Sequence, residues 1–133
     1  SAFDNSGLED IKLPRALRVI DEQTFSDCKN LQSVAFPNGS ELEEICRTAF
    51  YGSGLESFVV PRSLRKIGNM AFAYCEHLRE VIFLFGYGQR YISNFSYCPS
   101  EFGETAQNGA YWIRTDAFNG CRNLSLFTFT DGY

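Results

Sequence analysis

Apolar positions along the chain repeat with a period of about 23 residues. The most regular of them is a phenylalanine, preceded by Ala or Thr in five of six copies and followed at +3 by a small or sulfhydryl residue. Such a period is typical of a solenoid, because a single coil cannot bury its apolar face unless neighbouring coils stack on it. The pattern predicts a repeat array with one anchor per coil, at Phe3, Phe25, Phe50, Phe72, Phe95 and Phe118.

The segment after each anchor has the pattern of a short strand. A Leu is followed at +3 and +5 by apolar residues, and these share one face of a strand because side chains alternate. Pro14, Pro37 and Pro61 close three of these segments, where the missing N–H and fixed φ turn the chain out of a sheet. We expect one parallel sheet in sequence order, formed by strands near 8–13, 31–36, 55–60 and 78–83.

A second apolar step follows each proline corner. It reads Leu-x-x-Ile, as at Leu42 and Ile45, and leads into an Ala-Phe-x-x-Cys segment. The spacing of three between Phe and Cys suits a single helical turn. Each coil is therefore predicted to contain one strand, one corner and one short turn, with Phe25, Phe50 and Phe72 buried and stacked on one another.

Two copies depart from the pattern. In residues 75–98 the spacing is kept, but Tyr87 and Arg90 replace the second-step Leu and Ile. The next copy, residues 99–121, has lost still more of the consensus. Because the length is preserved, we expect both coils to be present and locally irregular.

The combined pattern, clearest from Leu55 to Cys75, resembles the BspA-like leucine-rich repeat family over nearly the whole chain. The resemblance implies an α/β repeat: a right-handed leucine-rich-repeat solenoid of about 23-residue coils, with a parallel sheet on one face and short helices or turns on the other. It also implies kinship with bacterial and protist surface proteins, many of them linked to adhesion and host binding. It supplies no catalytic residues. Residues 1–133 are expected to form one domain, and because residues 2–8 match 49–55 inside a repeat, we expect a fragment of a longer array.

The functional residues of such an array should point outward and differ between coils. Val59 and Ile82 form an apolar centre in the outward row of the strands and are a candidate docking strip. Phe85, Tyr111 and Trp112 stand where other coils carry polar residues, and Trp and Tyr bury large areas at low entropy cost, as in interaction hot spots. Alternatively, these rings fill gaps that the irregular coils leave in their own core. The full outward row is Lys12, Ala35, Val59, Ile82, Thr105 and Thr128.

Charge narrows the class of partner. A formal net charge of −4 argues against nucleic acid or an anionic membrane surface, both of which require a basic footprint. The expected partner is an extracellular-matrix, host or surface protein, with no direct membrane insertion by this chain. Arg18, Glu43 and Arg65 occupy equivalent positions on successive coils, and their alternating sign predicts ion pairs between coils, each worth ~0.2–1 kcal/mol.

The five cysteines are predicted to be mainly buried structural thiols. Cys75, Cys98 and Cys121 fall in one row with parallel side chains about 4.8 Å apart, whereas a disulfide requires converging Cβ atoms. A zinc site is not expected, because the chain has no Cys-x-x-Cys pair and its single His77 follows Cys75 by two residues. Cys46 is the exception, expected to be exposed and oxidisable.

The sequence contains no evident catalytic constellation. Nucleophilic catalysis needs a nucleophile, a base and an orienting group in contact, and His77 has no evident partner. We therefore expect no enzyme activity and no cofactor. Two hypotheses remain: a protein-binding module of a cell-surface or secreted protein that acts in adhesion or partner recognition, or an intracellular scaffold for protein assembly.

Overall fold

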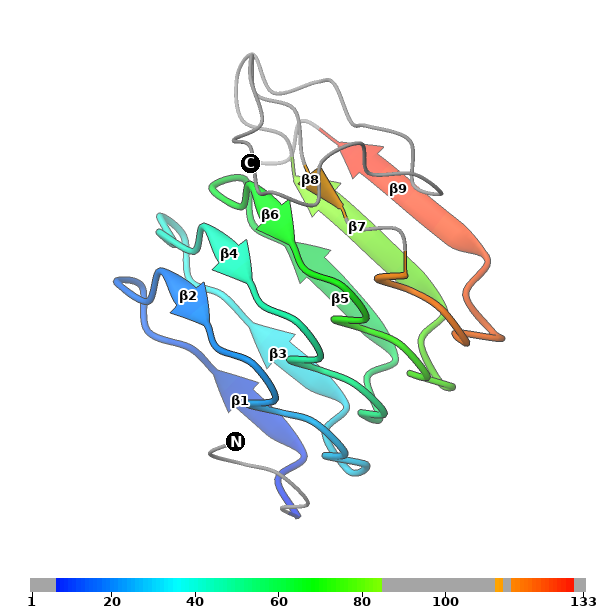
Figure 1. The fold of residues 1–133 in the computed structure, drawn as a ribbon. Helices are drawn as coiled ribbons and strands as arrows, with labels where there is room; N and C mark the ends of the chain where they lie inside the picture. Colours follow the sequence, from blue (N-terminus) through cyan, green and yellow to red (C-terminus); the bar gives the residue numbers. More distant parts are fainter. Residues whose placement is uncertain (1–6, 85–111, 114–115, 131–133) are drawn as a thin grey trace.

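The computed structural model describes residues 7–84, 112–113 and 116–130. In these residues the chain winds through successive coils and places its short strands in two parallel rows on opposite sides of the array (Figure 1). The expected stacking of parallel strands is confirmed. The described residues contain no helix, so the helical turns expected from the sequence are wrong.

The first row contains the strands that follow the Leu positions. Their order along the array is the order in the sequence, as predicted, but the expected single sheet is interrupted. One ladder joins β1 to β3 and another joins β5, β7 and β9, while β3 and β5 are linked through the Glu56 N–H, which donates to the Gln32 carbonyl at 3.2 Å. The strands are β1 (Asp10–Lys12), β3 (Ser33–Ala35), β5 (Ser57–Val60), β7 (Glu80–Leu84) and β9 (Leu126–Thr130).

The second row was not foreseen from the sequence. Here the Leu-x-x-Ile steps form a parallel sheet in the order β2, β4, β6, β8. Each strand contributes two residues, and in β2, β4 and β6 one of the two faces the core: Ile20, Ile45 and Ile67 are all buried. The strands are β2 (Val19–Ile20), β4 (Glu44–Ile45), β6 (Lys66–Ile67) and β8 (Trp112–Ile113).

The Ala-Phe-x-x-Cys segments are tight turns because left-handed backbone interrupts them on both sides. A right-handed helix cannot continue through residues of positive φ. Each anchor instead bonds the next coil: Phe50 N–H donates to Ala71 at 2.7 Å and Phe72 N–H to Ala117 at 2.8 Å. The positive φ values before the anchor are 61° at Gln23, 54° at Thr48 and 57° at Met70; those after it are 57° at Asp27, 67° at Gly52, 58° at Tyr74 and 76° at Gly120.

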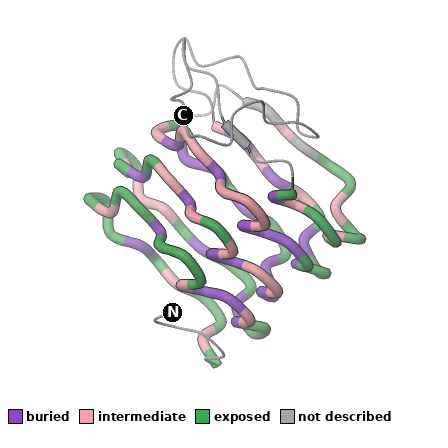
Figure 2. The backbone as a smooth tube through the Cα atoms, viewed as in Figure 1, coloured by how far each residue is buried: buried purple, intermediate pink, exposed green. Residues whose placement is uncertain are grey.

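The core is a ladder of phenylalanine rings running along the array. Phe25, Phe50 and Phe72 are buried and stacked, as predicted, with ring centroids 5.1 Å apart at both steps. The ring of Phe58 on β5 meets those of Phe50 and Phe72 edge-on, with centroid distances of 5.4 and 4.8 Å. The first strand row therefore packs against the ladder of rings through β5. The buried stretches recur in successive coils (Figure 2). Offset and edge-on rings both exploit the aromatic quadrupole.

The array passes directly from the coil of Phe72 to that of Phe118. The two rings stack at 5.2 Å, and β9 pairs with β7 while β8 pairs with β6. The coils of Phe72 and Phe118 are therefore direct neighbours, whereas the coil expected around Phe95 falls in residues 85–111, outside the described residues. Residues 85–111 connect β7 to β8, where 61–65 connect β5 to β6. Phe3, Phe95 and Cys98 lie outside the described residues.

Candidate functional site

The outer face of the first strand row carries the predicted docking strip. Val59 and Ile82 are register partners on β5 and β7, and Ile82 is next paired with Thr128 on β9. Val59 is 38% exposed and Ile82 is partly buried. The predicted outward row is confirmed in its described members, but Ile82 and Thr128 are direct partners, and Thr105, expected between them, lies outside the described residues.

A groove begins at Val59 and follows the proline corners. Its volume is about 820 Å³, within the usual range for a binding site. Apolar side chains of the strand ends and corners form much of the wall, with two arginines at the margin. The lining residues are Val34, Ala35, Phe36, Pro37, Asn38, Gly39, Ser40, Val59, Pro61, Arg62, Ser63, Arg65 and Leu84. We call this the corner groove; the sequence predicted that Val59 faces outward from its strand, but not that it lines a groove together with Phe36 and Arg65.

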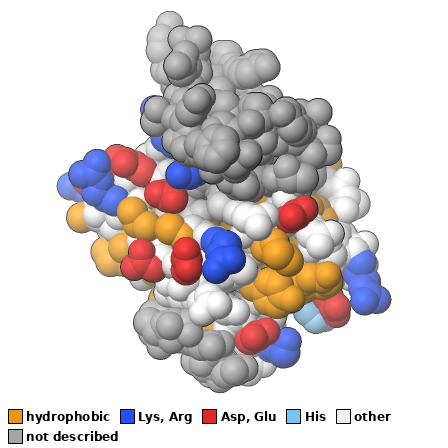
Figure 3. Space-filling model, viewed as in Figure 1, with side chains coloured by type: hydrophobic (Ala, Val, Ile, Leu, Met, Phe, Trp, Pro, Cys, Tyr) orange, Lys and Arg blue, Asp and Glu red, His pale blue; other side chains and the backbone are white. Residues whose placement is uncertain are grey.

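Charges of opposite sign lie beside one another on the coils, as Figure 3 shows for one face. The predicted pairing of Arg18 with Glu43 is confirmed, with Nη2 and Oε2 2.7 Å apart on exposed side chains. Lys66 similarly approaches Glu44 at 3.7 Å on the second sheet. The third member of the predicted row, Arg65, lines the corner groove instead.

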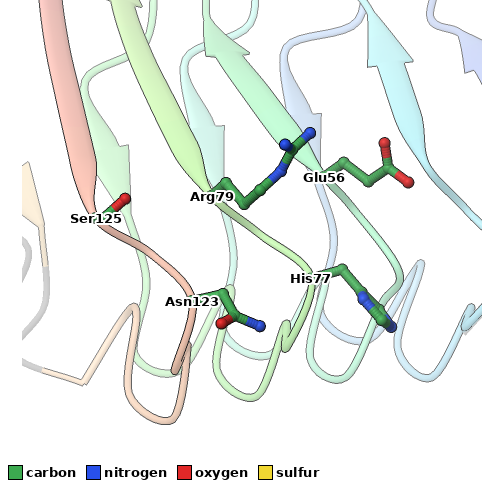
Figure 4. A pocket seen from close by; sticks show the side chains of 5 residues that line it. All are labelled: Glu56, His77, Arg79, Asn123 and Ser125. Atoms are coloured by element: carbon green, nitrogen blue, oxygen red, sulfur yellow. The ribbon is translucent and has the colours of Figure 1, made fainter.

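A polar pocket of about 520 Å³ lies where the chain enters β5, β7 and β9. In Figure 4 the Arg79 side chain extends towards the coil of Glu56, whose carboxylate points away from it. His77 is exposed, as expected, and Asn123 donates through Nδ2 to the Glu76 carbonyl at 2.6 Å. Ser125, the remaining lining residue, donates through its backbone N–H to the Arg79 carbonyl at 3.2 Å. The pocket therefore has the character of a hydrated edge between coils.

The turn edge carries a tyrosine pair that sequence reasoning missed. The rings of Tyr51 and Tyr74 lie 5.4 Å apart, and Tyr74 is 42% exposed. The Tyr74 ring covers Gly120, where a Cβ would lie 2.5 Å from it. The only signal in the sequence was the replacement of a small turn residue by Tyr, which does not reveal which coil it covers.

The thiols act as hydrogen-bond donors in the turns. Cys75 Sγ donates to the Phe50 carbonyl at 3.1 Å and Cys121 Sγ to the Phe72 carbonyl at 3.0 Å. Burial raises the pKa of the Cys75 thiol, which keeps it protonated for this role. The interpretation of Cys28 and Cys75 as buried structural thiols is confirmed.

Cys46 differs from its expectation. It is partly buried, and this burial, followed by the charge and hydrogen bond of Glu44, raises the pKa of the Cys46 thiol to about 11. Because the thiolate is the form that oxidises readily, Cys46 is less reactive than an exposed cysteine.

The second predicted site is not tested by the geometry. Phe85 and Tyr111 lie outside the described residues. Trp112 of β8 is the register partner of Lys66 on β6. This agrees with the prediction that Trp112 stands where other coils carry a polar residue.

Comparison with known families shows to which repeat family the chain belongs. A family model described as the BspA type leucine rich repeat region matches residues 1–125 with six copies. The chain belongs to this family. Leucine-rich repeat modules of this kind generally mediate protein interactions and are generally non-enzymatic.

Two solved structures share the fold of this BspA-type chain. One is a leucine-rich repeat protein from Eubacterium ventriosum, with 15% identity, a TM-score of 0.59 and coverage of 92% of this chain and 33% of that one. The other is a leucine rich cell surface protein from Faecalibacterium prausnitzii, with 20% identity, a TM-score of 0.55 and coverage of 92% and 42%. The chain thus spans less than half the length of either structure. No curated protein matches it in sequence.

Within the described part of the BspA-type chain, no cluster of three or more His, Cys, Asp or Glu side chains is arranged to hold a metal ion. No helix in that same part is long and apolar enough to cross a membrane.

Proposed function

We propose that this BspA-type module binds a protein partner through the outer face of β5 and β7 and the adjoining corner groove, as part of a cell-surface or secreted protein that acts in adhesion or partner recognition. The carrying observation is the exposed apolar Val59, which lies both on the strand face and in the groove wall. A strip of this kind loses little conformational entropy on docking because its backbone is held by the β5–β7 and β7–β9 ladders.

The surface role draws support from the Faecalibacterium structure, described as that of a cell surface protein. The same groove would serve an intracellular scaffold, so the identity of the partner separates the two roles. Phe85, Tyr111 and Trp112 remain a second proposed contact region. No reaction is assigned to the module.

The test measures binding of the purified chain to two panels, one of extracellular-matrix and cell-surface proteins and one of cytosolic proteins. Binding of any partner found is then measured again with two matched variants of the chain. Val59→Glu places a charge in the strip and is expected to weaken binding at least about tenfold, because a desolvated charge is costly at an interface. Val19→Glu is the control, since Val19 has nearly the same exposure, 39% against 38%, but belongs to the second sheet.

Binding confined to the first panel, and lost only in Val59→Glu, supports the proposal. Binding confined to cytosolic proteins would assign the scaffold role. Equal loss in both variants, with both folded by circular dichroism, would contradict the proposed face.

A further inference from the structure

The charge of the corner groove differs from that of the whole chain. The chain has a net charge of −4, yet among the residues that the structure describes the groove lining contains Arg62 and Arg65 and no Asp or Glu. An arginine margin on an apolar surface, in an otherwise acidic protein, attracts negative charge to one place and repels it from the rest.

Arg65 is the groove arginine whose guanidinium has an unpaired hydrogen-bond donor. Its coil neighbour Glu43 is engaged by Arg18 at 2.7 Å, and the Arg65 backbone N–H donates to the Glu43 carbonyl at 2.9 Å. Arg65 Nη1 is buried and has no hydrogen-bond partner. Buried donors in proteins are nearly always paired, and a guanidinium is best satisfied by a carboxylate.

The apolar part of the groove crosses three coils. Phe36 follows β3, Val59 and Pro61 lie at the end of β5, and Leu84 ends β7. With neighbouring strands about 4.8 Å apart, the groove spans roughly 10 Å, a length that about three residues of an extended peptide cover. A peptide whose side chains alternate can place apolar groups on this wall and polar groups at the margin.

We propose that the corner groove binds an extended acidic peptide segment of a partner protein, with apolar side chains against Phe36, Val59 and Leu84 and a carboxylate bonded to the Arg65 guanidinium. The proposal rests on the proposed function and adds the chemistry of the partner. Recognition of acidic segments by arginines and of extended segments by apolar grooves are both established physical modes.

The experiment measures fluorescence anisotropy with three labelled, end-capped hexapeptides that alternate aspartate with leucine, lysine with leucine, or aspartate with serine. The aspartate–leucine peptide is expected to bind at least about tenfold more tightly than either of the others, because each control lacks one of the two kinds of contact. Its affinity should fall as NaCl rises from about 50 to about 300 mM, since the margin charges are partly solvated.

Arg65→Gln removes the charge and is expected to weaken binding of the aspartate–leucine peptide about tenfold, the size of one charge-assisted bond. Arg47→Gln makes the same charge change at an exposed arginine paired with Glu22, outside the groove lining, and should leave the affinity unchanged. Should Arg65→Gln not fold, the salt and peptide series on the unchanged chain decides alone.

Equal affinity for the lysine and aspartate peptides, no peptide binding, or binding insensitive to Arg65→Gln in a folded variant would each overturn this inference. If a partner from the protein panels still depends on Val59, the proposed function stands without it. If instead the acidic peptide binds as expected while no panel protein does, the groove chemistry is supported and the partner class is wrong.

Discussion

At the scale of single residues, Phe50 has a ring on each side of it. Its ring is fully buried between those of Phe25 and Phe72, inclined to them by 12° and 5°, and Phe58 meets it edge-on. We expect Phe50→Ala to lower the free energy of unfolding by ~3–5 kcal/mol, because the cavity opens in the middle of the ladder. Phe50→Leu, which keeps most of the volume, should cost about 1–2 kcal/mol.

Urea denaturation followed by circular dichroism measures both changes. A cost of less than about 1 kcal/mol for Phe50→Ala would mean that the ladder does not hold adjacent coils together.

The Cys46 thiol gives a prediction about pH. With a pKa raised to about 11, mainly by burial, the folded chain has very little thiolate at pH 8, roughly one part in a thousand. Alkylation by iodoacetamide should therefore be slow at pH 8 and should rise about tenfold per pH unit up to about pH 10. Mass spectrometry of the modified peptide gives the rate.

The urea-unfolded chain is the control for Cys46, and its alkylation should level off near the ordinary thiol pKa of about 8.5. A folded chain that levels off at the same pH would contradict the effect of burial and of Glu44.

At the scale of elements, the approach of one coil to the next depends on Gly54. Its N–H donates to the Cys28 carbonyl at 3.1 Å, and a Cβ at this position would collide with the Lys29 carbonyl oxygen. Gly54→Ala is therefore expected to destabilise the chain by about 1–3 kcal/mol, because backbone rather than a movable side chain must give way. Gly7→Ala, where a Cβ would meet nothing within 4 Å, should change stability by less than about 0.5 kcal/mol.

Thermal unfolding of the two glycine variants, measured side by side, tests this contact. Similar melting temperatures for Gly54→Ala and Gly7→Ala would show that the coils are less closely packed than described.

The strands differ in how far the sequence could predict them. Those of the first row could be predicted because apolar residues such as Phe58 and Val60 alternate over several positions. A two-residue strand such as Glu44–Ile45 has no room for alternation, so its pairing partner, Lys66–Ile67, depends on stacking between coils. The turns were mistaken for helices because non-glycine residues such as Thr48 adopt positive φ, which spacing does not reveal.

The candidate site could be predicted only in part for the same reason. The alternation around Val59 showed that its side chain points outward, and the structure agrees. Whether Val59 lines one groove together with Phe36 and Arg65 depends on how three successive corners align, and no local pattern in the sequence encodes that alignment.

At the scale of the whole molecule, the coil expected around Phe95 falls in the segment 85–111, and the coils before and after this segment are direct neighbours in the array. The segment is close to one repeat in length, so Phe95 falls at an even interval between Phe72 and Phe118 although those two rings are in direct contact. Even spacing is therefore weak evidence for a coil when the second apolar step is missing, as it is at Tyr87 and Arg90.

In the proposed function the stacked coils themselves present the binding face, with the strip at Val59 and Ile82 as its centre. Register places Phe83 opposite Val60 and Trp112 opposite Lys66, so residues 61–65 correspond in sequence position to 84–111. The most direct test replaces 85–111 with the sequence of 62–65 and measures the dissociation constant for the partner found in the panels. The account predicts cooperative unfolding, affinity within about threefold of the unchanged chain, and loss of that affinity on adding Val59→Glu. A shortened chain that folds cooperatively but no longer binds would contradict it, because the contacts would then come from the region of Phe85 and Tyr111.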